Sequence, residues 1–380
     1  MRTLNELLNS PDGLRFLESK GVFVAQQEFR EQLKTPAKPN LVDMLGLQDT
    51  KLICSGQQLY IDYRQSVLSK IQTLHDFEHA SDLFPFFLWM DTDRSGSDSL
   101  ITKFAWPTSN KKGLIGIAPP GTKDIESRFV SLDESHLRSA MDKLVTHLLK
   151  SGEKRKAAKL KYKQLRAIFV HENPGVLSDF NHQVTYFLLN NHLGFSPYSV
   201  IISEVLNRGI VTDEVNLYIN NLAGIVRVFN ESVQSLIEQG IDPQVKPLHE
   251  NYFPLFYSCE HDHQRLRLVH NIDGDDHYAV GACKHGHDYK FHLGTKHLSI
   301  AEIAQTNRWS PDVCMPAFFN DLVSGFVAGK SSTLYLIVIN AVLRQVLDKS
   351  PVPILVPESL GQQAHAPDPL DSLLYEYFNA

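Results

Sequence analysis

The sequence predicts an α/β protein with a Rossmann-like open parallel sheet, a helical insertion and a small zinc-ribbon-like β-hairpin. Two observations predict the parallel sheet of this fold. Two buried strands, at 51–55 and 83–91, flank a segment whose apolar residues recur at helical spacing. A strongly apolar helix at 333–347 is followed by a short apolar strand at 352–358. Strands that alternate with helices in this way are typical of a parallel sheet.

Four segments are expected along the chain: N-terminal helices and the first half of the sheet at 1–130, the helical insertion at 131–245, the zinc-ribbon-like hairpin at 246–300, and the second half of the sheet with a C-terminal tail at 301–380. Pro36 and Pro39 interrupt the N-terminal helices. Gly56 is expected to form a sharp turn after the first strand, because glycine tolerates conformations closed to other residues. The apolar stretch 113–119 is expected to be a third strand of the sheet.

Composition narrows the class of protein. The chain has 380 residues and a net charge of −6, which argues against a protein that coats nucleic acid over its whole surface. It has no apolar run of about 18 residues, so no transmembrane helix and no membrane partner are predicted. The first residues lack the apolar core of a signal peptide, and a cytoplasmic location is expected. The four cysteines do not suggest a disulfide framework in a chain of this length.

Residues 259–287 predict a metal site. The stretch begins and ends with Cys-x-His-x-His, and the strands expected at 265–270 and 277–282 are joined by an Asp-Gly-Asp turn at 273–275. A hairpin brings its two ends together, and zinc takes four nitrogen or sulfur ligands in a tetrahedron. Four of six candidates would bind a structural zinc ion: Cys259, His261, His263, Cys283, His285 and His287. One Cys and one His from each end is the simplest set, and a histidine-rich surface hairpin without metal is the alternative.

Positive charge is concentrated at 154–166, where seven of thirteen residues are Lys or Arg. A run of this kind is usually a solvated face of a helix. The alternative is a surface that contacts RNA, a phosphorylated partner or a carrier protein.

The stretch 325–336, GFVAGKSSTLYL, partly matches a phosphate-binding P-loop. A P-loop needs Gly-x-x-x-x-Gly-Lys-[Ser/Thr], and position 324 is serine where the first glycine should stand. We therefore interpret Gly329 as a turn that leads into a helix. Backbone N–H groups at a helix N-terminus can hold an anion, here together with Lys330, Ser331 and Ser332. A plain strand-to-helix turn is the alternative.

Several of these segments resemble the bacillithiol-biosynthesis cysteine ligases. The Ser-Gly-Gln-Gln at 55–58 resembles that family's Thr-Gly-Gln-Gln after the first strand, and the strand at 83–91 resembles its second strand. Further matches lie in the second half of the sheet: Ser310, Pro311 and Val313 in the family's Ser-Pro-Asn-Val, Asn320 and Asp321 in place of its Gln-Asp, and Gly329 and Tyr335 at equivalent positions. The chain is thereby identified as a diverged relative of this family.

The sequence also departs from the family. Thr92-Asp93-Arg94 stands where the family has Glu-Asp-His, and Lys330 and Ser332 replace its proline and glutamate. The C-terminal coiled coil through which the family dimerises is missing, which leaves the oligomeric state open.

The resemblance implies an ATP-dependent ligase that joins an amino acid, cysteine in that family, to a second substrate through a carbon–nitrogen bond, with ATP and Mg²⁺ as co-substrate. Parallel sheets bind ligands beyond the carboxyl ends of their strands, so the loops at 55–58 and 329–332 are expected to face each other across one cleft. Residues expected in catalysis are Gln57, Asp91, Asp93, Asn320, Asp321 and Lys330. Residues expected to bind substrate or nucleotide are Ser55, Gly56, Gln58, Gly329, Ser331, Ser332 and Tyr335.

A competing hypothesis is a non-catalytic binding protein, or a protein similar to the class I aminoacyl-tRNA synthetases. The hairpin at 246–300 resembles the zinc ribbon of class I lysyl-tRNA synthetases. Such a protein would contact RNA or a carrier protein through its basic helix and its hairpin.

Overall fold

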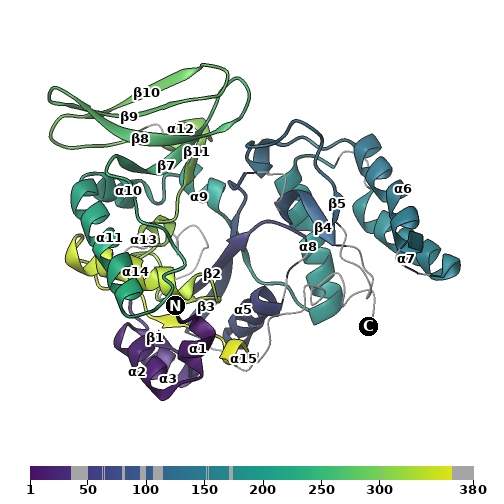
Figure 1. Cartoon of the computed structure of the whole chain (residues 1–380), viewed down its shortest axis with the longest axis horizontal. Coiled ribbons are helices and arrows are strands. Elements are labelled where there is room, and N and C mark those ends of the chain that lie inside the picture. Colours follow the sequence, from purple (N-terminus) through teal and green to yellow (C-terminus); the bar gives the residue numbers. More distant parts are fainter. Residues whose placement is uncertain are drawn as a thin grey trace.

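The computed structural model describes residues 1–35, 50–61, 63, 65–78, 82–94, 100–105, 114–150, 152, 154–170, 174–301 and 303–361 (Figure 1). The predictions for Pro36, Pro39 and the C-terminal tail lie outside these residues. Within the described ranges, none of the helices combines the length and the apolar character that crossing a bilayer requires.

A six-stranded sheet forms the centre of the molecule (Figure 1), in the order β1–β13–β12–β2–β3–β6. Every pair of neighbours is parallel, which confirms the predicted Rossmann-like open sheet. Its strands come from both ends of the chain: β1 (Val22–Phe23), β2 (Lys51–Gln58), β3 (Leu83–Met90), β6 (Ser199–Ile201), β12 (Gly325–Val327) and β13 (Ile354–Leu355). The two predicted halves therefore form one sheet.

Both faces of this sheet are buried. Side chains alternate between the two faces along each strand, so each strand contributes to two cores. Cys54 of β2 and Leu88 of β3 enter one core, which also contains the apolar side of α14 (Thr333–Gln345). Ile53 and Trp89 enter a second core on the other face. Continuous apolar runs such as Leu83–Met90 result from this two-sided burial.

The helices lie on both sides of the central sheet (Figure 1). The first core contains residues of the N-terminal helices, of the second half of the insertion and of α14, and the second core contains residues of α5 to α8. The remaining helices are α1 (Leu4–Leu8), α2 (Pro11–Ser19), α3 (Gln26–Glu31), α5 (Gln65–Phe77), α6 (Glu134–Lys150), α7 (Arg155–Phe169), α8 (Leu177–Leu193), α9 (Ile202–Asn207), α10 (Thr212–Ile219), α11 (Leu222–Glu238), α12 (Ile303–Thr306), α13 (Met315–Phe318) and α15 (Glu358–Gly361).

Three expectations about the first half of the sheet need correction. Gly56 is not a turn: it pairs with Leu88 inside the eight-residue strand β2, where a Cβ would lie 3.0 Å from the Leu88 carbonyl oxygen. The glycine thus permits close strand packing. The stretch at 113–119 does form β5 (Leu114–Gly116), but β5 pairs antiparallel with β4 (Lys103–Ala105) in a separate two-stranded sheet. The helical insertion also contributes β6 to the central sheet.

A second, five-stranded sheet is antiparallel and has the order β10–β9–β8–β7–β11 (Figure 1). Its centre is the predicted hairpin, with Asp273 paired to Asp276 across the turn. The sheet is larger than the expected ribbon, because strands on both sides extend the hairpin: β7 (Tyr252–Ser258), β8 (Arg265–Asp273), β9 (Asp276–Ala282), β10 (Asp288–Gly294) and β11 (Trp309–Pro311).

Candidate functional site

A pocket of about 450 Å³ lies between the carboxyl edge of the central sheet and the second sheet. Met90, the last residue of β3, marks the carboxyl edge, and Tyr335 belongs to the first turn of α14. The lining residues are Met90, Asp93, Arg94, Phe256, Arg265, Arg267, Pro311, Asp312, Val313, Met315, Pro316 and Tyr335. Ligands of open parallel sheets bind at this edge.

The side chain of Arg265 forms one wall of the pocket and is only 10% exposed. It donates hydrogen bonds to Ser310 Oγ at 3.1 Å and to the Pro311 carbonyl at 3.0 Å. Its Nη1 lies 3.4 Å from Asp93 Oδ1, and its guanidinium stacks over the Phe256 ring at 3.8 Å. A planar guanidinium held from four directions has little rotational freedom, so this wall is rigid.

A buried ion-pair network supports that wall. Glu126 is fully buried and accepts hydrogen bonds from Arg128 Nε at 2.7 Å and from Ser310 Oγ at 2.6 Å. Arg265 Nε also lies 3.4 Å from Glu126 Oε1. Arg128 donates to the Trp309 carbonyl at 3.1 Å. Because Glu126 and Arg128 precede the insertion while Ser310 and Trp309 belong to β11, the network joins the second sheet to the body of the protein.

The two predicted aspartates have different surroundings. Asp93 lines the pocket and accepts a hydrogen bond from the Gln58 side chain. Asp91 is buried beneath the start of α9, where it accepts the Ser203 N–H at 3.1 Å and the Ser203 hydroxyl. Burial raises the pKa of Asp91 to about 6. Of the two, Asp93 is therefore the one placed to touch a ligand in this pocket.

The two stretches expected to share a site, 55–58 and 329–332, lie side by side because β2 and β12 are neighbours. Ser55 donates its hydroxyl to the Val327 carbonyl at 2.8 Å and is buried. Residues 56–58 are strand rather than loop, so only their side chains and the strand end reach the carboxyl edge.

Lys70 connects these two stretches, and the sequence interpretation missed it. Its Nζ donates to the Gly56 carbonyl at 2.6 Å and to Gln57 Oε1 at 3.1 Å, and its stem passes next to Gly329. Burial lowers the pKa of Lys70 to about 8. The signal was a lysine on the apolar face of an amphipathic helix, between Leu68 and Ile71.

The turn at 329–332 is closed by its own side chains. Ser332 Oγ accepts the Gly329 N–H at 2.8 Å, and the Thr333 hydroxyl donates to the Gly329 carbonyl at 2.8 Å. Ser331 is exposed. Lys330 is half-buried, and this desolvation lowers the pKa of its amine. Lys330 and Ser331 are therefore the side chains of this turn that are open to an anion.

Asn320 and Asp321 lie on the wrong side of the sheet for the role expected of them. They precede β12, at the amino edge, where the Ser324 N–H donates to the Leu52 carbonyl near the start of β2 at 2.7 Å. Asp321 forms an ion pair with Lys349 there. Because neighbouring parallel strands begin at one edge and end at the other, residues before β12 are separated from residues after it by the strand itself. Asn320 and Asp321 therefore belong to no common site with Gln57 or Lys330.

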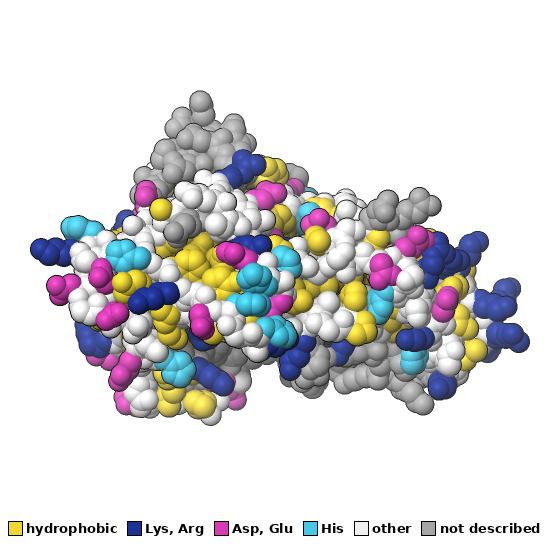
Figure 2. Space-filling model, turned by 90° about the horizontal axis from the view of Figure 1, so that it is seen from above, with side chains coloured by type: hydrophobic (Ala, Val, Ile, Leu, Met, Phe, Trp, Pro, Cys, Tyr) yellow, Lys and Arg dark blue, Asp and Glu magenta, His cyan; other side chains and the backbone are white. Residues whose placement is uncertain are grey.

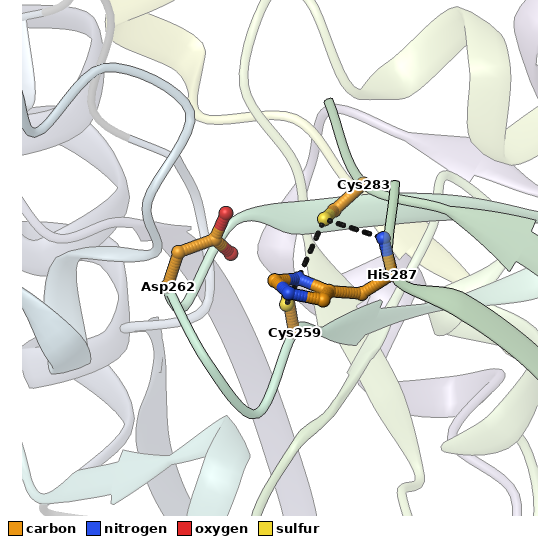
Figure 3. A group of neighbouring side chains, drawn as sticks. All are labelled: Cys259, Asp262, Cys283 and His287. Atoms are coloured by element: carbon orange, nitrogen blue, oxygen red, sulfur yellow. Dashed lines mark hydrogen bonds between the residues drawn. The ribbon is translucent and has the colours of Figure 1, made fainter. Parts of the chain in front are cut away.

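A second group of side chains has the chemistry of a metal site (Figure 3). Cys259, Asp262, Cys283 and His287 each offer one ligand atom, and these atoms all lie within 4.8 Å of one another. His287 Nδ1 is 3.1 Å from Cys283 Sγ and 3.5 Å from Cys259 Sγ. The ends of the predicted hairpin thus come together as expected.

Two tight turns place these ligands. In the first, the His263 N–H donates to the Cys259 carbonyl at 3.0 Å, and His263 has a positive φ of 56°. In the second, the Cys283 N–H donates to the His287 carbonyl at 3.0 Å, with Gly286 at a φ of 82°. Glycine adopts this left-handed conformation without strain.

The donor set fits a tetrahedral cation such as zinc, which binds cysteine sulfur, histidine nitrogen and aspartate oxygen. Asp262 Oδ2 is buried and has no hydrogen bond within the described part of the chain, although His285 Nε2 approaches it to 3.4 Å. Its other oxygen accepts the Gln264 N–H at 3.0 Å. A buried carboxylate oxygen without a hydrogen bond, next to two thiols, is in a position to accept a cation.

Three of the six predicted ligands lie outside this group. The His261 ring packs against His287, the His263 ring stacks on Phe129, and His285 approaches Asp262. Asp262 was missed because the repeated Cys-x-His-x-His pattern draws attention to the histidines on either side of it. The other two cysteines, Cys54 and Cys314, are buried core residues, and all four cysteines are free.

Compared with models of known families and with curated proteins, the sequence matches none. The resemblance to the cysteine ligases therefore remains a prediction. Two features of the structure support a function. They are the pocket at the carboxyl edge and the group formed by Cys259, Asp262, Cys283 and His287.

Proposed function

We propose that the chain is an ATP-dependent ligase that joins an amino acid to a second substrate through a carbon–nitrogen bond in the carboxyl-edge pocket. The mixed charge of the pocket is the observation that carries this proposal. Arg94 and Arg267 stand at its rim together with Asp93 and Asp312. A free amino acid carries an ammonium and a carboxylate, so its binding site needs both a carboxylate and a cation.

The rim arginines have the freedom that ligand binding requires. Arg94 is 2.9 Å from Asp124, and Arg267 is 3.4 Å from Asp312, and both guanidinium groups are more than half exposed. Exposed ion pairs of this kind contribute about 0–1 kcal/mol, so a carboxylate or phosphate of a substrate can replace the partner at little cost. Arginine also matches the planar, bidentate geometry of these anions.

The roles follow from position. Asp93 would bind the substrate ammonium, and Arg267 and Arg94 would bind a carboxylate or phosphate. Lys330 and the N-terminal end of α14 would stabilise negative charge that develops on a transferred group. Formation of an amide in water needs an activated carboxyl group, and ATP with Mg²⁺ would supply the activation.

We also propose that the metal is zinc and that its role is structural. Cys259, Asp262, Cys283 and His287 would complete its tetrahedron and leave no position for a substrate or a reactive water. The bound ion would fix the two turns from which β8 and β10 start. Since β8 carries Arg265 and Arg267, the metal would support one wall of the pocket from outside.

Binding and turnover of ATP test the ligase proposal. Purified protein is titrated with MgATP and with each of the common amino acids by calorimetry, and release of phosphate or pyrophosphate is then measured with the amino acids that bind. We expect heat from ATP and from at least one amino acid. Arg267→Gln should weaken binding of that amino acid, whereas Lys296→Gln, an exposed lysine away from the pocket, should not. Absence of heat from ATP and from every amino acid would favour the non-catalytic binding protein instead.

A further inference from the structure

The helical hairpin of α6 and α7 carries a dense positive charge that the proposed ligase does not use. From Lys143 to Arg166, nine residues are Lys or Arg and one is acidic, in a chain with a net charge of −6. α7 itself contains no carboxylate. Figure 2 shows dark blue side chains gathered at the end of the molecule where Figure 1 places α6 and α7.

The fold of the hairpin directs these charges outward. The apolar side of α7, which includes Ala158, Leu165 and Phe169, is buried in the second core against α6. The other side exposes Lys156, Lys159, Lys163 and Arg166. These residues are spaced three or four positions apart, so they form a row along one face of the helix. At 1.5 Å per residue the row is about 15 Å long.

Among the described residues, the row lacks the acidic partners that a solvated charged helix usually has. Within the described residues, Lys156, Lys159 and Lys163 form no ion pair. Lys163, Arg166 and Arg138 of α6 instead line a shallow hollow of about 310 Å³. Like charges three or four residues apart destabilise an isolated helix by roughly 0.2–0.5 kcal/mol per pair. An anion with several regularly spaced charges would relieve this repulsion.

We infer that this face of α7 binds the phosphate backbone of a nucleic acid. The row offers about one cation per helical turn, which complements a polyanion with repeating charges. Gln164 is the exposed amide within α7, so contact with base edges is minor and binding is expected to be independent of sequence. A lipid surface is a poorer match, because α7 exposes only one large apolar side chain, Leu160, and its apolar face is already packed.

Fluorescence anisotropy of the full chain with a labelled RNA duplex of about 20 base pairs, and with the DNA duplex of the same sequence, tests this inference. We expect both to bind. With about four phosphates neutralised, the affinity should fall roughly 100-fold between 50 and 200 mM salt. The triple variant K156E/K159E/K163E should bind at least about tenfold more weakly and lower the salt slope by about 2.7. The control K246E/K290E/K296E changes the net charge equally at exposed lysines outside the hairpin and should stay within about threefold of the unmodified chain.

Three results would overturn the inference: no binding of either duplex at 50 mM salt, equal loss of binding in both triple variants, or binding to phosphatidylserine vesicles without binding to nucleic acid. Circular dichroism of the α7 variant shows whether its helices are intact. Because the readout is binding, the result does not depend on whether the chain is a ligase.

Discussion

The metal group and the carboxyl-edge pocket both involve the second sheet, yet they are built in opposite ways. The four side chains that could hold the metal lie within one stretch, Cys259–His287, and one hairpin brings them together. The pocket takes its lining from β3, β7, β8, β11, α13 and α14, which span most of the chain. A site built from one hairpin needs only that hairpin to be folded. A site built from many elements needs all of them to be folded. Loss of the metal should therefore perturb the pocket, whereas substitutions in the pocket should leave the metal bound.

Loss of the metal should have the largest effect. Zinc bound with a picomolar Kd contributes about 8 kcal/mol of folding free energy at micromolar free metal. We expect metal analysis to give about one zinc per chain, and Asp262→Ala and His287→Ala to lose the metal and to melt at a lower temperature. His261→Ala is the matched control, because His261 lies beside the group without belonging to it.

Two outcomes would remove the metal site from the comparison. One is equal zinc content in His261→Ala and His287→Ala, both lower than in the unmodified chain. The other is a melting curve that a chelator leaves unchanged.

Replacement of Arg265 should have the next largest effect and should separate the two regions. Arg265→Gln leaves Glu126 and Asp93 without this buried cation, and a broken buried ion pair costs about 3–5 kcal/mol. Urea denaturation should show this loss while the zinc content stays unchanged. Arg94→Gln, which breaks an exposed pair with Asp124, should cost less than about 1 kcal/mol. Loss of zinc from Arg265→Gln would show that a substitution in the pocket does affect the metal site, contrary to this expectation.

Lys330 follows β12 at the carboxyl edge, outside the lining of the pocket, and its test depends on the proposed ligase. Removal of one charge-assisted contact in the transition state costs roughly 2–4 kcal/mol, or about 30- to 1,000-fold in turnover. Lys330→Ala should therefore lower turnover by this factor while the melting temperature and the zinc content stay nearly constant. Lys296→Ala serves as the exposed control. Unchanged turnover in Lys330→Ala would remove the 329–332 turn from the site.

The smallest effect is expected from Lys70, and it depends on pH. Burial lowers the pKa of Lys70 to about 8 in the folded chain, below its value in the unfolded chain. Below pH 8 the amine is charged in both states and the cost of burying the charge is fully present. As the pH rises above 8, the folded form deprotonates first and the cost disappears.

The free energy of unfolding should therefore rise with pH above 8 in the unmodified chain relative to Lys70→Met, by no more than about 3 kcal/mol. Urea denaturation of both proteins at pH 7.5, 8.5 and 9.5 measures this difference. A difference in unfolding free energy that stays constant over this pH range would contradict the lowered pKa of Lys70.

Elements with a local signal were predicted well from the sequence. The hairpin at 265–282 has alternating strands and an Asp-Gly-Asp turn, and both signals lie within the segment that forms it. The strands predicted at 51–55 and 83–91 are apolar because both faces of the sheet are covered, although β2 continues as strand to Gln58. β6 was missed because three residues between two helices are too few to show a period.

Features that depend on distant contacts could not be predicted in this way. Gly56 suggested a turn, whereas its actual requirement is the close carbonyl of Leu88 on the next strand. Asn320 was assigned to the site because Asn320-Asp321 stands in place of the Gln-Asp of the resembled ligase family, and only the strand direction separates it from the carboxyl edge. Arg265 and Arg267 showed no pattern of their own, since the pocket that makes them notable is formed by five other elements.

The position of β1 in the central sheet has a consequence for synthesis of the chain. Among the described strands, β1 pairs with β13 alone, through Val22 and Ile354, and Ile354 leaves the ribosome long after β1 does. At about 5–20 residues per second, the delay is roughly 15–70 s. During this time β2, β3 and β6 can assemble, while β1 stays unpaired beside the short helices α2 and α3. β13, the last of the described strands, therefore closes the sheet, and a ribosome that pauses before β13 is made would hold a chain with an open edge.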